Sequence, residues 1–220
     1  MKKSYLILNI VLICLIVALD VCYATLGGLW LKALASLSFV ALGAVNLFIM
    51  LKEKHENKQF AIIMLVGLVF AMAGDIVLNI FFIGGAALFA VGHVFYFVSY
   101  CKLVSFKAKD LLWGALIFVP SVLFITLAPI FDFGGLVMEL VCVIYAIIIS
   151  LMVGKSISNL VQEKNLLNIL LVVGSCLFFF SDLMLLLNVF ADLPLIFDAL
   201  CLATYYPAQA ILAHSIIQTK

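Results

Sequence analysis

Two aspartates, Asp75 and Asp182, stand inside long apolar stretches of the sequence and are its best candidates for chemistry. If these stretches are membrane-crossing helices, each aspartate lies about 22 to 24 Å from the same membrane face, at 1.5 Å per residue. An ionisable group in hydrocarbon costs about 3 kcal/mol, so each requires a partner or a purpose. Two carboxyl groups at one depth could form an acid–base pair, in which one donates a proton and the other activates water.

Other polar residues are expected in the same half of the membrane. Counted from the opposite membrane face, Lys32 and Glu139 lie about 5 to 8 Å deep. Four further polar residues lie about 13 to 23 Å deep: His93, Tyr96, Tyr205 and Gln209. Ser181 directly precedes Asp182. Lys32 is the cation expected to keep one carboxylate ionised. The other half of most helices is nearly pure Leu, Ile, Val and Phe.

Several polar residues are interpreted as structural. Isolated ones are expected to form hydrogen bonds between neighbouring helices: Asn46, Asn188, Ser121 and Thr126. Four aspartates are expected to mark the membrane interface: Asp20, Asp132, Asp192 and Asp198.

Metal and serine chemistry fit the sequence poorly. A zinc hydrolase needs three converging ligands, whereas His55 and His214 are expected far from His93, so no metal site is predicted. A catalytic triad of Ser181, His93 and Asp75 is disfavoured because the sequence has no G-x-S-x-G motif around the serine. Ser181 also directly precedes Asp182, and the side chains of neighbouring residues on a helix point in different directions. The six cysteines are single residues without C-x-x-C spacing, which is typical of small buried apolar side chains.

Two further functions could use the same pair of carboxyl groups, and both remain open. Intramembrane aspartyl proteases use paired aspartates, but their Tyr-Asp, Gly-x-Gly-Asp and Pro-Ala-Leu motifs are only approached here, at Ser181-Asp182, Ala73-Gly74-Asp75 and Pro207-Ala208-Gln209. A proton-coupled lipid or small-molecule transporter would use the same carboxylates to bind and release protons. Alternating access requires polar residues on both sides of the midplane, and the sequence predicts them on one side.

The composition explains why these residues must be carried by membrane helices. The chain has 220 residues, of which 68% are hydrophobic and 10% charged, with a mean hydropathy of +1.37. A water-soluble domain is nearer half apolar and a quarter charged, so a soluble catalytic domain is excluded. Twelve lysines against eleven acidic residues, with no arginine, give a net charge of +1, which indicates no nucleic-acid surface.

Eight apolar stretches are long enough to span a bilayer. They cover about residues 5–22, 29–51, 60–80, 84–101, 111–130, 134–153, 166–188 and 194–217. None shows the strict alternation of a barrel strand. The prediction is an all-α polytopic membrane protein with eight transmembrane helices in one domain, residues 1–220, whose first stretch is a helix and not a cleaved signal peptide.

Lysines predict the orientation. If the N-terminus is cytoplasmic, eleven of the twelve lysines fall on the cytoplasmic side: Lys2, Lys3, Lys52, Lys54, Lys58, Lys102, Lys107, Lys109, Lys220 and, in the loop after residue 153, Lys155 and Lys164. The opposite loops carry no lysine. By the positive-inside rule both termini are cytoplasmic, and the polar cluster faces the other leaflet.

Four short motifs occur in order along the chain: Gly74-Asp75-x-x-Leu78, Gly92-His93-x-x-Tyr96, Phe180-Ser181-Asp182 and Tyr205-Tyr206-x-x-Gln209. Together with Lys32 they resemble the YhhN family of eight-helix membrane proteins, the lysoplasmalogenases. The similarity covers nearly the whole chain, from Lys32 to Gln209. One departure is Ala33, which follows Lys32 where the family commonly has proline.

The resemblance implies hydrolysis of the vinyl ether bond of a lysoplasmalogen to a fatty aldehyde and glycerophosphoethanolamine or glycerophosphocholine. Asp75 and Asp182 would be the acid–base pair, and the other candidates would bind substrate: Lys32, His93, Tyr96, Glu139, Ser181, Tyr205 and Gln209. The reaction needs no metal or cofactor, and the expected partners are the lyso-ether lipid and the bilayer. Compact loops suggest a bacterial inner membrane. The head group, the oligomeric state and which aspartate is the acid stay open.

Overall fold

The structure is a computed structural model that describes residues 3–191, 193 and 196–218. Their regular elements are eight α-helices and a short 3-10 helix: α1 (Lys3–Leu26), α2 (Leu29–Lys52), α3 (Lys58–Leu78), α4 (Phe82–Leu103), α5 (Asp110–Leu127), α6 (Leu136–Gln162), α7 (Leu166–Phe190), α8 (Ile196–Ser215) and η1 (Ile216–Gln218). The predicted all-α fold with eight spanning helices is confirmed. Lys2, Asp192 and Lys220 lie outside the described residues.

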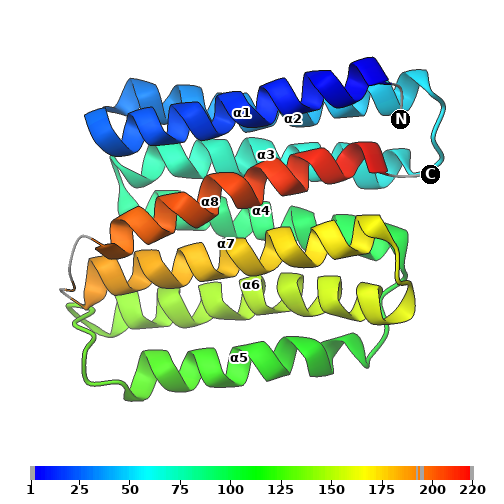
Figure 1. The fold of residues 1–220 in the computed structure, drawn as a ribbon. Helices are drawn as coiled ribbons and strands as arrows, with labels where there is room; N and C mark the ends of the chain where they lie inside the picture. The colour runs from blue at the N-terminus through cyan, green and yellow to red at the C-terminus, as the bar shows by residue number, and fades with distance from the viewer. Residues whose placement is uncertain (1–2, 192, 194–195, 219–220) are drawn as a thin grey trace.

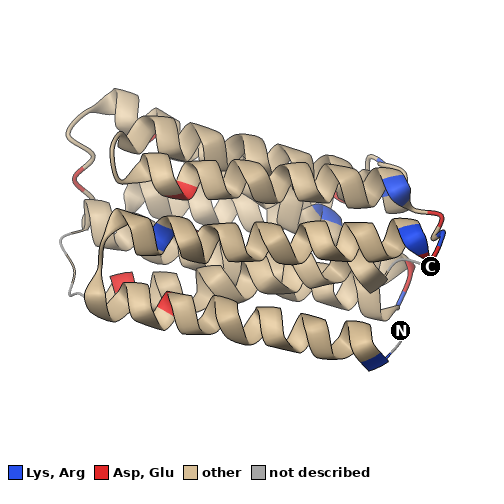
Figure 2. Cartoon of the chain, turned by 90° about the horizontal axis from the view of Figure 1, so that it is seen from above, with Lys and Arg blue, Asp and Glu red and all other residues tan. Residues whose placement is uncertain are grey.

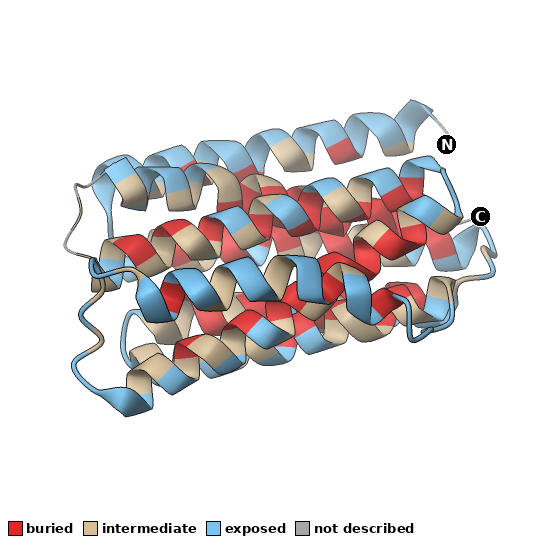
Figure 3. Cartoon of the chain, turned by 90° about the horizontal axis from the view of Figure 1, so that it is seen from below, coloured by how far each residue is buried: buried red, intermediate tan, exposed pale blue. Residues whose placement is uncertain are grey.

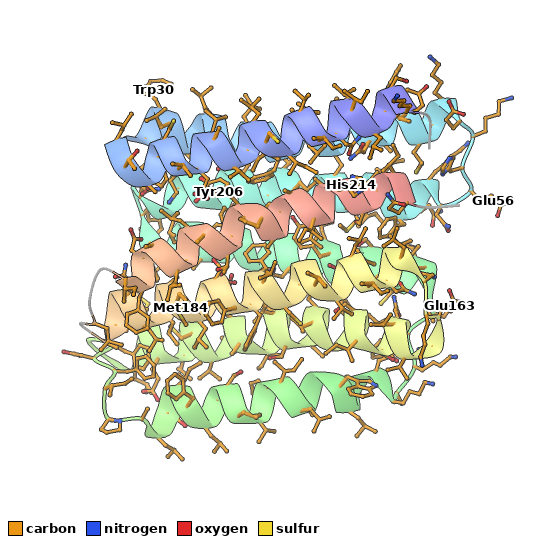
Figure 4. All side chains as sticks on the ribbon, viewed as in Figure 1. Trp30, Glu56, Glu163, Met184, Tyr206 and His214 are labelled. Carbon is orange, nitrogen blue, oxygen red and sulfur yellow. The ribbon has the colours of Figure 1, made fainter. Side chains whose placement is uncertain are left out.

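All eight helices are long and apolar enough to cross a membrane. The shortest has 18 residues and the longest 27, or about 27 to 40 Å, against a hydrocarbon core of about 30 Å. Their outer faces are apolar, and the side chain of Trp30, which is 85% exposed, points away from the bundle (Figure 4). An exposed tryptophan at a helix end is typical of the membrane–water interface. These features identify an integral membrane protein.

The helices form two layers (Figure 1). One layer contains α1, α8 and α7, and the other contains α2, α3 and α4. Helix α6 packs against both α4 and α7, and α5 packs on the outer side of α6. Buried residues concentrate in the middle of the bundle, whereas α1 is exposed along most of its length (Figure 3).

Both chain ends lie at the same end of the bundle (Figure 1), called here the terminal end. Most of the lysines gather there (Figure 2). Lys32, in the first turn of α2, lies at the other end of the bundle, called here the distal end. The charge asymmetry that the sequence predicts is therefore present between the two ends.

Helix α6 corrects one expectation. Lys155 was expected in a loop, but α6 continues to Gln162 and Lys155 is fully buried inside the bundle. Its Nζ lies 2.7 Å from Oδ2 of Asp110, at the start of α5, and Ser158 Oγ donates to Oδ1 of the same carboxylate at 2.5 Å. The helix can continue past Lys155 because Asp110 balances the lysine charge inside the bundle, so that this charge does not need water.

The terminal half of the bundle also differs from expectation, because it is not free of polar residues. Asn9 and Asn46 exchange two hydrogen bonds at 2.8 and 2.9 Å, and Asn46 also donates to the carbonyl of Ala213 at 3.0 Å. His214 Nδ1 lies 2.8 Å from Oδ1 of Asn9. Figure 4 shows His214 on α8, nearer the terminal end than Tyr206. As predicted, Asn46 joins neighbouring helices, but polar groups lie in both halves.

The Lys155–Asp110 pair generates a stability prediction. Replacing Lys155 with methionine leaves a buried carboxylate without its cation, which costs about 3 kcal/mol of unfolding free energy. Thermal unfolding of the purified protein in detergent measures the loss. Lys102→Met, at an exposed position near the same end of the bundle, is the matched control and should change stability by less than about 0.5 kcal/mol. Equal effects of the two variants would contradict a structural role for the pair.

Candidate functional site

Glycines let α3 and α4 approach closely, and this contact positions two of the predicted site residues. A Cβ on Gly85 of α4 would lie 2.4 Å from Cα of Leu78 in α3, and one on Gly74 would lie 3.0 Å from the Phe89 ring. Small residues are the usual means of such close helix contacts in membranes. Asp75 follows Gly74 directly and His93 follows Gly92, so these glycines hold both side chains near the contact between the two helices.

Asp75 lies in a buried polar group built from three helices. Lys32 Nζ lies 3.1 Å from Oδ1, Tyr206 Oη donates to Oδ2 at 2.9 Å, and Ser36 Oγ also donates to Oδ2. The carboxylate therefore contacts one cation and two hydroxyl donors. The Lys32 ammonium is in turn 5.5 Å from the ring centre of Tyr23. These partners provide the ion pair and the hydrogen bonds that a carboxylate requires inside the hydrocarbon region.

Asp182 has a different set of partners. Tyr145 Oη, on α6, donates to its Oδ2 at 2.7 Å, and His93 Nε2, on α4, lies 3.2 Å from the same oxygen. His93 Nε2 and Tyr145 Oη are themselves 2.8 Å apart, so the three groups form a triangle. The ring of His93 is fully buried and packs edge-to-face against Phe178, with ring centres 4.5 Å apart. Asp182 keeps a partly exposed side chain, at 13%.

One cavity borders both carboxylates. It has a volume of about 190 Å³, and its wall includes polar groups from five helices: Tyr23, Lys32, Asp75, Asn79, Ser181, Asp182, Asp198, Cys201 and Tyr205. This space is called here the polar cavity. A molecule or water inside it would stand between Asp75 and Asp182. Asp75 and Asp182, which the sequence predicts to meet at one site, both line this space.

A second cavity adjoins Asp182 on another side. It measures about 400 Å³ and is lined by α4, α5, α6, α7 and the end of α3, with a wall that is apolar except at a few positions. This space is called here the apolar cavity. Five residues belong to both walls: Leu78, Phe82, Phe89, Asp182 and Leu185. Asp182 therefore stands where a polar and an apolar compartment meet.

The structure brings most of the candidates that the sequence suggested into the same part of the bundle, although not all of them line a cavity. Lys32, Ser181 and Tyr205 line the polar cavity with the two aspartates, and Ser181 Oγ lies 3.4 Å from the sulfur of Cys201. Tyr96 and Gln209 are fully buried outside both walls, where the tyrosine hydroxyl donates to Oε1 of the amide at 2.8 Å.

Glu139 is the predicted residue that lies apart. It is half-buried in the first turn of α6 and belongs to neither cavity wall. Its depth in the membrane matched that of Lys32, but depth does not specify which face of a helix points inward. Nothing in its position links it to the two carboxylates.

Sequence reasoning missed two hydroxyl groups of the site, Ser36 and Tyr145, and named Tyr206 only as part of a motif. Ser36 follows Lys32 by one helical turn, a spacing that puts both on one face and could have been noticed. Tyr145 stands in an otherwise apolar stretch and gives no signal. Asp20 was expected to mark the interface, yet it is buried and its Oδ1 has no hydrogen-bond partner among the described residues. Within the described ranges, no three His, Cys, Asp or Glu side chains converge to hold a metal ion.

Comparisons with known proteins return one result. A sequence profile of the YhhN family matches residues 30–216, which cover α2 from its second residue, α3 to α8, and all of the cavity-lining residues named above except Tyr23. No curated protein and no solved structure matches the chain.

The glycine contacts generate a prediction for the site scaffold. Gly85→Ala places a methyl group 2.5 Å from the backbone nitrogen of Leu78, so α3 and α4 must separate, at a cost of about 1 to 3 kcal/mol of unfolding free energy. At Gly92 the nearest atom would be 3.3 Å away, so Gly92→Ala should change stability by less than about 1 kcal/mol. Thermal unfolding in detergent compares the two. A larger loss at Gly92 would show that this contact does not hold the helices.

Proposed function

The chain belongs to the YhhN family, a family associated with lysoplasmalogenase activity, and from this premise we propose that it hydrolyses the vinyl ether bond of lysoplasmalogens. The products would be a fatty aldehyde and glycerophosphoethanolamine or glycerophosphocholine. The observation that carries the proposal is the polar cavity that borders both Asp75 and Asp182. A pair of carboxyl groups on either side of an ether bond is also the arrangement by which glycosidases cleave acetals.

Asp75 is assigned the role of the base. Its carboxylate is 3.1 Å from the Lys32 ammonium and accepts hydrogen bonds from Tyr206 and Ser36, which hold it at the wall of the polar cavity. From this position it can accept a proton from water in the cavity.

Asp182 is assigned the role of the acid. Its partners are the neutral hydroxyl of Tyr145 and the ring of His93, and both contact Oδ2. The second oxygen, Oδ1, is the one assigned to proton transfer. His93 and Tyr145 would position the carboxyl group, and after each cycle the proton taken up by Asp75 would return to Asp182 through water in the polar cavity that both carboxyl groups border.

The proposed reaction has three steps. Asp182 donates its proton to the β-carbon of the vinyl ether, and the double bond becomes a C–H bond and an oxocarbenium ion. Water adds to the carbon of that cation while Asp75 takes a water proton, which gives a hemiacetal. The hemiacetal then breaks its bond to the glycerol oxygen, which takes up a proton as the hydroxyl group loses one, and releases the aldehyde.

The remaining polar groups would serve the substrate. Lys32 lies in the first turn of α2, where a phosphate at the membrane interface could contact it. Ser181 and Tyr205, in the wall of the polar cavity, would orient the glycerol or the water. Tyr96 and Gln209 lie behind this wall, and their hydrogen bond would support it.

We further propose that the terminal end faces the cytoplasm of a bacterial inner membrane. The lysine-rich loops lie at that end, in keeping with the positive-inside rule (Figure 2). The site would then open toward the non-cytoplasmic leaflet, where the lipid substrate and bilayer are its partners.

A proton-coupled transporter is the second candidate, and the Asn9–Asn46–His214 group favours it because polar residues occur in both halves of the bundle. These groups are hydrogen-bonded to one another, which is typical of helix packing. Uptake of labelled lysolipid into vesicles containing the protein, without aldehyde release, would support transport in place of hydrolysis.

Product analysis tests the reaction class. The purified protein is incubated with three matched lysolipids that carry a vinyl ether, a saturated ether or an ester chain, and the products are identified by mass spectrometry. Aldehyde is expected from the vinyl ether alone, because only that bond forms an oxocarbenium ion on protonation. Fatty acid from the ester, or no product from any of the three, would refute the proposal.

Variants of the two aspartates test their roles. Asp75→Asn and Asp182→Asn should each lower kcat by about 10² to 10⁴, the usual contribution of a general acid or base. Asp132→Asn, in an exposed loop at the distal end, is the matched control and should retain wild-type turnover. Near-normal turnover of either site variant would exclude that residue as a catalytic group.

A further inference from the structure

The apolar cavity has the character of a binding site for a hydrocarbon chain. Its wall comes from five helices, and most of its residues are Leu, Ile, Val, Phe and Ala. At about 400 Å³ it falls within the range of small-molecule pockets, about 300 to 1,000 Å³.

The few polar groups in this wall are already engaged. Ser121 Oγ donates to the backbone carbonyl of Ile117 at 2.8 Å, and Tyr145 Oη donates to Asp182. An occupant of this space therefore meets hydrocarbon surface everywhere except at Asp182. Such a surface favours an apolar chain over any hydrogen-bonding ligand.

The two cavities lie next to each other, an arrangement that suits a lipid with one chain and a polar head. Phe82, Phe89 and Asp182 belong to both walls. A molecule with its chain in the apolar cavity and its head beside Lys32 would thus cross from one compartment to the other at Asp182. The bond between chain and head is the vinyl ether in a lysoplasmalogen.

Helix α5 gives this cavity a route to the bilayer. At the terminal end α5 is held to α6, where a Cβ on Gly154 would lie 2.4 Å from the backbone nitrogen of Gly114 and where Lys155 pairs with Asp110. Beyond that contact, Leu116 and Phe124 of α5 line the cavity while they are also exposed on the outer surface of the bundle. The wall on the α5 side therefore meets the lipid.

From these observations we propose that the apolar cavity binds the alkyl chain of the lysolipid, which enters from the bilayer beside α5 and places its ether bond at Asp182. This inference rests on the proposed function. It adds that Ala146 and Ala86, whose small side chains line the cavity, determine the chain length that the protein accepts.

Photo-crosslinking tests chain binding without turnover. A saturated alkyl-ether lysolipid with a diazirine at the end of its chain is irradiated with the protein in nanodiscs, and labelled peptides are mapped by mass spectrometry. Labels are expected on the cavity-lining segments 116–125 and 141–149, and unlabelled lysoplasmalogen should remove them by competition. Labels confined to the lipid-facing surface of α1 would overturn the proposal.

A cavity-filling variant tests chain selection. Ala146→Phe should lower labelling and kcat/KM for a long-chain substrate about tenfold, and affect a short-chain substrate less, because the added ring occupies the space of the chain. Ala86→Phe is a second variant should the first not fold. Ala18→Phe, on the exposed face of α1, is the matched control and should leave both substrates unaffected. An unchanged chain-length profile in folded Ala146→Phe and Ala86→Phe would also overturn the proposal.

The two experiments separate this inference from the proposed function. Labels in the cavity without hydrolysis of any lysolipid would refute the hydrolase and retain the chain site. Aldehyde release with labels outside the cavity would retain the hydrolase and refute the chain site.

Discussion

The structure depends on ion pairs and hydrogen bonds that join carboxyl groups among the membrane helices to side chains of other helices. Asp75 is paired with Lys32 of α2, Asp110 with Lys155 of α6, and Asp182 with His93 and Tyr145 of α4 and α6. Hydrocarbon offers no water to substitute for a missing partner, so each pair fixes the relative positions of the helices that carry it. The charges that could do chemistry are thus also constraints on the fold.

Much of the fold could be predicted because hydropathy alone marks membrane spans. All eight helices begin and end near the predicted limits, apart from α6, which extends past residue 153 to Gln162. The reason for that error is physical: a lysine ends a span only when its charge reaches water. The partner that neutralises Lys155 is 45 residues away in the sequence, and no local pattern reveals it.

The sequence predicts the depth of each candidate residue in the membrane, and this depth was enough to group several of them into one candidate site. Lys32, Asp75 and Asp182 were recognised because charges in apolar stretches are rare, and they line one cavity. Glu139 was also charged and at a suitable depth, yet it lies apart, since depth does not determine which way a side chain points. Tyr145 was missed for the opposite reason: an aromatic residue in an apolar span resembles core until its hydroxyl is seen to reach Asp182.

The buried polar groups are arranged differently in the two halves of the bundle, and the difference bears on function. In the terminal half, Asn9, Asn46 and His214 direct their polar atoms at one another, so the helices close around them. In the distal half, Asp75 and Asp182 pair with separate partners and face a common space. Polar groups that serve only packing would be expected to close that space, as the asparagines do. A cavity bordered by two hydrogen-bonded carboxyl groups, next to an apolar cavity that shares part of its wall, is what an enzyme for a water-requiring reaction on a lipid chain needs.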